Sequence, residues 1–203
     1  MFRQSYRKLI TCQVLLMVTT VRKPKDPVLL ISDFVNTAIL GMGASEEFST
    51  PARLRRWLIS HDLIEKTQTV SNANLKRVIA FREALRNFLV RKGTRKVDPH
   101  TLHLLHDAAE RAKFSLTLSP TADAFLQPMA KGTDGALGCL LSMVYQTMCD
   151  GSWVQLRACR SDTCRMAYVD RSKNGSRIWC EMAICGNRMK ARWFRQRRAK
   201  AKR

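Results

Sequence analysis

Four cysteines near the C-terminal end carry the most distinctive chemistry in the chain: Cys159, Cys164, Cys180 and Cys185. They form two C-x4-C pairs with fifteen residues between them, enough chain to fold back and bring the pairs together. Four thiolates around one point are the ligand set of a structural zinc site, which has no open coordination position for a catalytic water. The spacing therefore predicts one structural Zn²⁺. Two disulfides, or four unconnected buried thiols, are the alternatives.

A strongly basic segment follows the last of these cysteines. From Gly186 to Arg203 there are nine lysines and arginines and no acid. Met189 and Trp193 are four residues apart, so a helix here would continue the Cys185 face and pack onto the metal module. Arg188, Arg192 and Arg195 would share a second face. The candidate nucleic-acid contacts on this helix are Arg188, Lys190, Arg192, Arg195, Arg197 and Arg198. A solvated basic tail is the alternative.

The segment between the cysteine pairs must bring the second pair back to the first. Residues 154–158 and 166–170 are expected to be strands on either side of the first pair. Asn174-Gly175 is a strong hairpin signal and predicts a return strand at 177–179. A knuckle, a hairpin and a final helix make a treble-clef-like arrangement. Further candidate nucleic-acid contacts lie in and beside this turn: Arg171, Lys173 and Arg177.

Some basic residues are also expected to serve the metal. Four thiolates around Zn²⁺ leave a formal charge of about −2, which nearby guanidinium groups would partly offset. The candidates for that role are Arg160, Arg165, Arg177 and Arg188.

Charge is distributed unevenly over the 203 residues. The net charge of +20 divides into +6 for residues 1–25, +2 for residues 26–156 and +12 for residues 157–203. A near-neutral body with a basic end favours association with a polyanion, either a nucleic acid or an anionic membrane. The cysteines outside the two pairs, Cys12, Cys139 and Cys149, lack ligand-like spacing and are expected to be buried apolar residues.

Residues 1–25 are expected to be a disordered basic extension, or to include an over-long start with the true first residue at Met17. The apolar stretch at 9–21 faintly resembles a signal sequence, but threonines and a glutamine dilute it and no small-x-small cleavage site follows. It is too short to span a bilayer, so no membrane partner is expected. A reducing compartment follows, which favours metal binding over disulfides.

Residues 26–150 are expected to form a helical body. A helix capped by Ser32 would end at Gly41, and Pro51 would begin another after Ser49 and Thr50. The clearest helix spans residues 72–92, with Arg86 among the residues assigned to its polar side. Asp98-Pro99 would open the next helix, a short strand would follow at 115–120, and a last helix would span 134–149. The predicted fold class is thus mainly α, with a small hairpin and a zinc module that ends in a basic helix.

Few residues of the body suggest a site. Asp33 and Asn36 fall on one helix face and are candidate ligand-binding residues, although capping and local hydrogen bonds explain them as well. His100, His103 and His106 lack a carboxylate or cysteine at matching spacing and are expected to be solvated. There is no glycine-rich phosphate loop and no G-x-S-x-G motif, so no enzyme is predicted.

Several short motifs resemble a known family. The motifs Asp170-x-Ser172, Arg177-x-Trp179-Cys180 and Cys185-Gly186-Asn187-Arg188 are similar to the CGNR zinc finger. The segments 33–37 (DFVNT) and 82–86 (REALR) resemble the ABATE domain that usually precedes this finger. Tyr168 stands where that family often has phenylalanine. The resemblance covers residues 28–203, with domains at 26–150 and 151–203. It implies a bacterial transcription regulator, related to stress, whose finger binds DNA.

The sequence therefore predicts a cytoplasmic, nucleoid-associated transcription regulator that binds double-stranded DNA through its zinc module. Its helical body would sense a small-molecule effector or form a homodimer. Two other functions stay open: an RNA-binding or ribosome-associated zinc protein, and a small-molecule-binding domain with an accessory finger.

Overall fold

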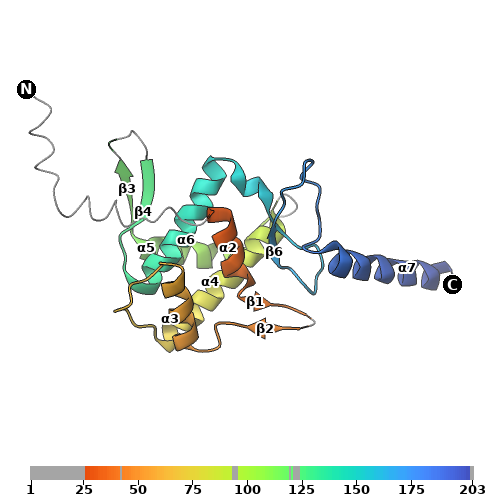
Figure 1. Cartoon of the computed structure of the whole chain (residues 1–203), viewed down its shortest axis with the longest axis horizontal. Coiled ribbons are helices and arrows are strands. Elements are labelled where there is room, and N and C mark those ends of the chain that lie inside the picture. The colour runs from red at the N-terminus through yellow and green to blue at the C-terminus, as the bar shows by residue number, and fades with distance from the viewer. Residues whose placement is uncertain (1–25, 42, 93–95, 119, 121–123, 202–203) are drawn as a thin grey trace, which may run out of the picture.

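The computed structural model describes residues 26–201 except 42, 93–95, 119 and 121–123. Its elements are arranged as a helical body from which one long helix extends at the C-terminal end (Figure 1). The expectations for residues 1–25, including Cys12, lie outside the described residues.

Five α-helices form the described body. Three of them, α2, α4 and α6, meet at the centre, while α3 and α5 lie against α4 (Figure 1). Their bounds are α2 Pro27–Asn36, α3 Pro51–Ser60, α4 Asn72–Arg91, α5 Pro99–Ala112 and α6 Gly132–Cys149.

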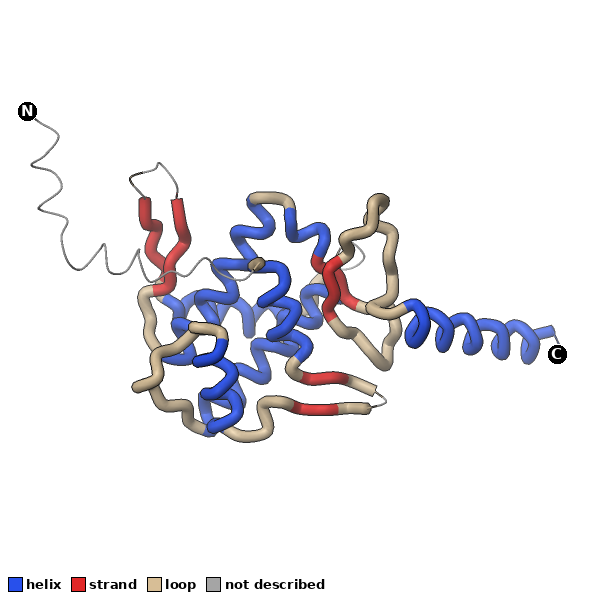
Figure 2. The backbone as a smooth tube through the Cα atoms, in the orientation of Figure 1, coloured by secondary structure: helices blue, strands red, loops and turns tan. Residues whose placement is uncertain are grey.

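Antiparallel two-stranded hairpins complete the described structure (Figure 2). The first two belong to the body and the third to the cysteine module. Together with the helices they confirm the predicted fold class. The pairs are β1 Ala38–Ile39 with β2 Ser45–Glu46, β3 Phe114–Leu118 with β4 Ala124–Pro128, and β5 Leu156–Ala158 with β6 Ala167–Val169.

An acceptor followed by proline begins three of the helices. Asp26, Thr50 and Asp98 each accept a hydrogen bond from a backbone N–H of the first turn, and a proline follows each. The prediction that Ser32 caps the first helix is wrong, because Asp26-Pro27 starts that helix six residues earlier. Ser32 is buried in the interior of α2 instead.

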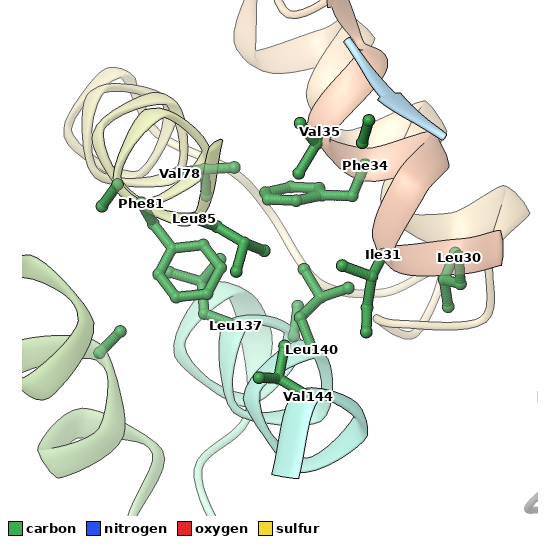
Figure 3. Close-up of a cluster of buried hydrophobic side chains, with 14 of the residues drawn as sticks. Leu30, Ile31, Phe34, Val35, Val78, Phe81, Leu85, Leu137, Leu140 and Val144 are labelled. Carbon is green, nitrogen blue, oxygen red and sulfur yellow. The ribbon is translucent and has the colours of Figure 1, made fainter. Parts of the chain in front are cut away.

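The hydrophobic core lies where α2, α4 and α6 meet (Figure 3). Phe34 of α2 is fully buried, and its ring lies 5.6 Å from Trp57 and 5.9 Å from Phe81. Burial of one such side chain stabilises the fold by about 1.5–3 kcal/mol. This aromatic cluster fixes α2 against α3 and α4, and α2 in turn positions the cysteine module.

Two arginines of α4 are completely buried in a charged network. The Arg82 guanidinium forms two parallel hydrogen bonds with the Glu46 carboxylate, at 2.7 and 2.6 Å. Glu83 bridges the pair, accepting from Arg82 Nε and Arg86 Nε at 2.9 Å each. Burial alone would lower the pKa of Arg82, but the bonds to Glu46 and Glu83 raise it above its ordinary value. The assignment of Arg86 to the solvent side of this helix is therefore wrong.

Candidate metal centre and basic helix

The four cysteines predicted as metal ligands lie together. Their Sγ atoms are all within 4.8 Å of one another, although the two pairs are separated by fifteen residues of chain. Cys159, Cys164 and Cys185 are buried and Cys180 is half-buried. Within the described residues, this is the only group of three or more cysteine, histidine or acidic side chains placed to hold a metal ion.

The sulfur geometry fits a tetrahedral ion. Zn–S bonds of about 2.3 Å place the sulfurs of a tetrahedron about 3.8 Å apart. The Sγ of Cys180 lies 3.5 Å from that of Cys164 and 3.7 Å from that of Cys185. The donor set and its spacing thus suit a four-thiolate metal site, which agrees with the prediction from the two C-x4-C pairs.

The four thiols are close enough together that a bound cation would stabilise their ionised forms. Burial, together with the neighbouring thiols, raises the pKa of Cys180 and raises that of Cys185 to about 11. Burial acts to raise the pKa of Cys159, but hydrogen bonds from the backbone N–H groups of Cys180 and Ser161 and with the Cys180 and Cys185 thiols together lower it. Without a bound cation, the cluster as a whole resists full ionisation, and a divalent metal would supply the missing positive charge.

The first cysteine pair sits on a tight knuckle. Cys159 N donates to Met166 O at 2.8 Å, and Cys164 N donates to Ser161 O at 2.9 Å. Arg165 closes the turn in the left-handed region, with φ of 49°. Strands β5 and β6 flank the knuckle, so their pairing holds Cys159 and Cys164 in position. The predicted strand at 154–158 begins as a 3-10 turn, η1 (Ser152–Gln155), before β5.

The loop between the cysteine pairs is held by a side chain, not by a strand. The buried Asp170 carboxylate accepts from Ser172 N, Ser172 Oγ and Arg177 N at 3.1, 2.6 and 3.1 Å. The predicted return strand at 177–179 is wrong, since this segment is loop (Figure 2). Asn174-Gly175 does turn the chain, but Asp170 replaces the cross-strand backbone bonds that a hairpin would need.

The basic residues of that loop have different surroundings. The Arg177 guanidinium lies 4.9 Å from the centre of the Tyr168 ring and donates to the carbonyl oxygens of Trp179 and Cys180. Arg171 pairs with Asp26 at 3.1 Å, while Lys173 is exposed. Arg177 thus holds the backbone at the start of the second cysteine pair, while its expected role in offsetting the thiolate charge stays a prediction.

The C-terminal helix α7 (Asn187–Ala201) follows directly from the last cysteine. Cys185 lies in a π-helical turn, η2 (Met182–Gly186), that leads into it. No residue of α7 is buried, and the helix extends away from the body (Figure 1). Trp193 contacts Trp179 at a ring distance of 6.2 Å but stays 46% exposed. The predicted packing of this tryptophan on the metal module is therefore only partial.

The basic side chains of α7 are open to solvent. Of the six predicted contacts, Arg188 is partly buried and the other five are exposed. Among the described residues, none of the ion pairs formed by arginine or lysine involves this helix. Their assignment to nucleic acid stays a prediction, and the structure leaves them available for it.

Helix α2 holds the cysteine module through one asparagine. Asn36 Nδ2 donates to Ala167 O at 2.8 Å, and Asn36 Oδ1 accepts from Ala167 N at 2.9 Å. Ser32 Oγ donates to the same carbonyl at 3.3 Å. The amide therefore pairs with β6 much as a neighbouring strand would. This explains Asn36 without a ligand, while Asp33 is exposed on the same helix.

Other body residues reach the module in the same way. Arg86 donates to the carbonyl of Arg165 at 3.3 Å, and Lys92 Nζ donates to the carbonyls of Trp153 and Leu156. Burial and the charge of Arg157 lower the pKa of Lys92 to about 8. Neither role could be predicted from the sequence, because both side chains bond to carbonyl groups, which every residue offers.

The hydrophobic contacts are continuous as well. Leu156 and Ala167 of the module belong to the same buried cluster as the body core, so residues on both sides of the predicted boundary at 150 share one core.

The remaining candidates of the body do not form a site. His100, His103 and His106 are exposed on α5, as expected. Cys139 is partly buried and its pKa is raised by burial, whereas Cys149 is exposed. The expectation of burial therefore fails for Cys149.

Among the described residues, no helix is both long and apolar enough to cross a membrane.

The fold and the site define a helical domain to which a four-cysteine zinc-finger module is firmly docked. Comparison with family models agrees with this description. The ABATE model, described as "putative stress-induced transcription regulator", matches residues 30–148, and the CGNR zinc-finger model matches residues 155–198. The chain belongs to the ABATE family and carries a CGNR zinc finger, which confirms the resemblance seen in the sequence. A comparison with curated proteins finds no match.

Proposed function

We propose that this protein is a DNA-binding transcription regulator in which one structural Zn²⁺, held by the four cysteines, fixes the basic helix α7 for contact with duplex DNA. When bound, the ion would neutralise the thiolates and cross-link the two loops. The proposal includes no catalytic step, because a site closed by four protein ligands has no position for a reacting water.

One observation carries the proposal. Helix α7 has seven lysines and arginines, no acidic residue, and no buried side chain. Like charges on an isolated helix repel one another and destabilise it, and phosphate groups would relieve that repulsion. Arginine predominates on α7, and its planar guanidinium suits both phosphates and guanine edges.

The body supplies the regulatory half of the proposal. An open cavity of about 690 Å³ lies between the segment after α3 and the beginning of α6. Its lining includes the apolar residues Ile59, Leu63 and Pro128 and the charged residues Glu65 and Lys131. This volume is within the range of small-molecule sites, so it is the candidate site for an effector. A homodimer and a cytoplasmic, nucleoid-associated location belong to the same proposal.

Binding to duplex DNA over a series of salt concentrations tests the role of α7. For the zinc-loaded protein, the logarithm of affinity should fall linearly with the logarithm of salt concentration, with a slope of roughly −0.9 per phosphate contacted. Arg192→Ala should weaken binding and reduce that slope by about 0.9. Lys76→Ala is the matched control, because it removes one exposed positive charge from α4 of the body.

If Arg188→Ala, Arg192→Ala and Arg195→Ala all bind DNA as tightly as Lys76→Ala, α7 is not the contact. An unbiased selection of nucleic acids by the zinc-loaded protein then identifies the preferred polymer. Consistent recovery of structured RNA would refute the assignment to duplex DNA.

A further inference from the structure

One tryptophan of the chain differs from the other three in exposure. Trp57, Trp153 and Trp179 are each less than a tenth exposed, whereas Trp193 is 46% exposed. The centre of its ring lies 6.2 Å from that of Trp179, and the residue as a whole stays nearly half exposed. Aromatic side chains gain much free energy from burial, so a half-exposed ring on a charged helix suggests a partner.

The surroundings of this ring have a specific chemistry. Trp193, Gln196, Arg197 and Lys200 line an open notch of about 340 Å³ along α7. Their spacing of three, four and seven residues places them on one side of the helix. The notch thus offers one aromatic face, one amide and two cations. An aromatic face suits a stacked base, and cations beside it suit the adjoining phosphates.

This side of α7 is separate from the arginine face. At 3.6 residues per turn, the notch lies about 120° around the helix from Arg188, Arg192 and Arg195. The neighbouring aromatic ring, Phe194, is 54% exposed, but the Arg198 guanidinium lies 5.7 Å from its centre. Phe194 is thus the more exposed ring, but it lies beside a cation of its own helix and is not among the residues that line the notch.

We propose that the Trp193 notch binds an unpaired base of single-stranded DNA. The base would stack on the indole ring, Arg197 and Lys200 would hold the flanking phosphates, and the Gln196 amide would reach the base edge. In a duplex the faces of the bases are covered by their neighbours, so only an unpaired base can stack in this way. The inference rests on the proposed function, in that α7 must contact nucleic acid.

The competing explanation is that Trp193 only anchors α7 to Trp179. Substitutions of different shape separate the two roles. Trp193→Leu keeps an apolar side chain against Trp179 but has no aromatic face, whereas Trp193→Phe keeps an aromatic face. Stacking predicts rescue by phenylalanine and not by leucine, and anchoring predicts that leucine suffices.

The experiment measures binding of the zinc-loaded full chain to oligothymidylate, to an abasic strand with the same number of phosphates, to oligouridylate and to duplex DNA. The wild type should prefer oligothymidylate over the abasic strand. Trp193→Ala and Trp193→Leu should each weaken oligothymidylate binding about tenfold, and Trp193→Phe much less. None of them should change binding to the abasic strand. Oligothymidylate should also quench the fluorescence of the one exposed tryptophan.

Several results would overturn the inference. Wild-type affinity of Trp193→Leu for oligothymidylate shows that the ring is only an anchor. Equal losses on the abasic strand show that α7 has been loosened. Tighter binding to oligouridylate than to oligothymidylate makes RNA the occupant.

Failure of the proposed function is distinguishable from these results. In that case Arg192→Ala would leave binding to all four ligands unchanged. If only the inference fails, binding to the duplex and the abasic strand still depends on Arg192.

Discussion

The hydrogen-bonded contact between Asn36 and β6 allows a quantitative prediction. Asn36→Ala removes both bonds to Ala167, at 2.8 and 2.9 Å. The carbonyl keeps the weaker bond from Ser32, at 3.3 Å, while the N–H loses its acceptor. Two hydrogen bonds of about 1 kcal/mol each, plus the cost of a partly buried unpaired N–H, give a loss of about 3 kcal/mol. For a chain of this size the midpoint of thermal unfolding should fall by roughly 6–12 °C.

The same substitution should weaken metal retention. Ala167 lies three residues after Cys164, so undocking β6 loosens the knuckle that holds the first cysteine pair. If the undocked module binds zinc poorly, the loss of about 3 kcal/mol of docking free energy can decrease the affinity for zinc by at most roughly 150-fold. Transfer of zinc to a chromophoric chelator measures this decrease, and thermal unfolding followed by circular dichroism measures stability.

Asp33→Ala is the control for both measurements, because Asp33 is exposed on the same helix. The reasoning is refuted if Asn36→Ala and Asp33→Ala unfold at the same temperature and release zinc to the chelator equally.

Three further predictions concern the close approach of Gly41 to the module, the buried ion pair of the body, and the dependence of the body on zinc. Gly41→Ala should destabilise the protein more than Gly43→Ala in chemical denaturation: both glycines have positive φ, but a Cβ at Gly41 would lie 2.3 Å from the Thr163 carbonyl oxygen, and a Cβ at Gly43 meets open space. Equal losses would argue against this close approach. Burial acts to raise the pKa of Glu46, but the bond to Arg82 outweighs it and holds that pKa below 4.5. This carboxylate therefore stabilises the fold above about pH 4.5, and the stabilisation is lost as pH falls through the depressed pKa. At neutral pH the unfolding midpoint of Glu46→Gln should then be lower than that of the wild type, and it should fall less than the wild-type midpoint when the pH is lowered. If the midpoints of the two proteins change with pH in parallel, the assignment is contradicted. Removal of zinc by a chelator should lower the unfolding midpoint of the helical body as well as that of the module, because the β5–β6 pair contributes to the body core. A body midpoint unaffected by chelation would show that the module unfolds separately.

The features that could be predicted from the sequence depend on residues close together in the chain. Asp98-Pro99 begins a helix because the cap and the fixed φ of proline act within one turn. The two C-x4-C pairs predict a metal site because each pair is already preorganised by its own loop. The start of α2 follows the same rule, because Asp26 caps the helix and Pro27 follows it, although the sequence prediction placed the cap at Ser32.

The failures concern polar residues whose partners are distant in sequence. The spacing of Arg86 suggested a solvated position, yet it donates to the carbonyls of Val35 and Ala38, about fifty residues away. Asn174-Gly175 forms a turn as predicted, but the backbone N–H groups of Ser172 and Arg177 donate to the buried Asp170 carboxylate and not to a partner strand. A carbonyl acceptor has no sequence signature, so such partners cannot be identified before the chain is folded.

The sequence by itself determined the four-thiol donor set, the order of the helices and the basic character of α7, because all three depend on residue type and local spacing. Only the tertiary structure decided that Asn36, Arg86 and Lys92 hold the cysteine module against the body, and that Trp193, in the middle of α7, is half-exposed. The physical reason is that burial and hydrogen-bond satisfaction depend on which distant segments meet, and a buried polar group must find its partner there.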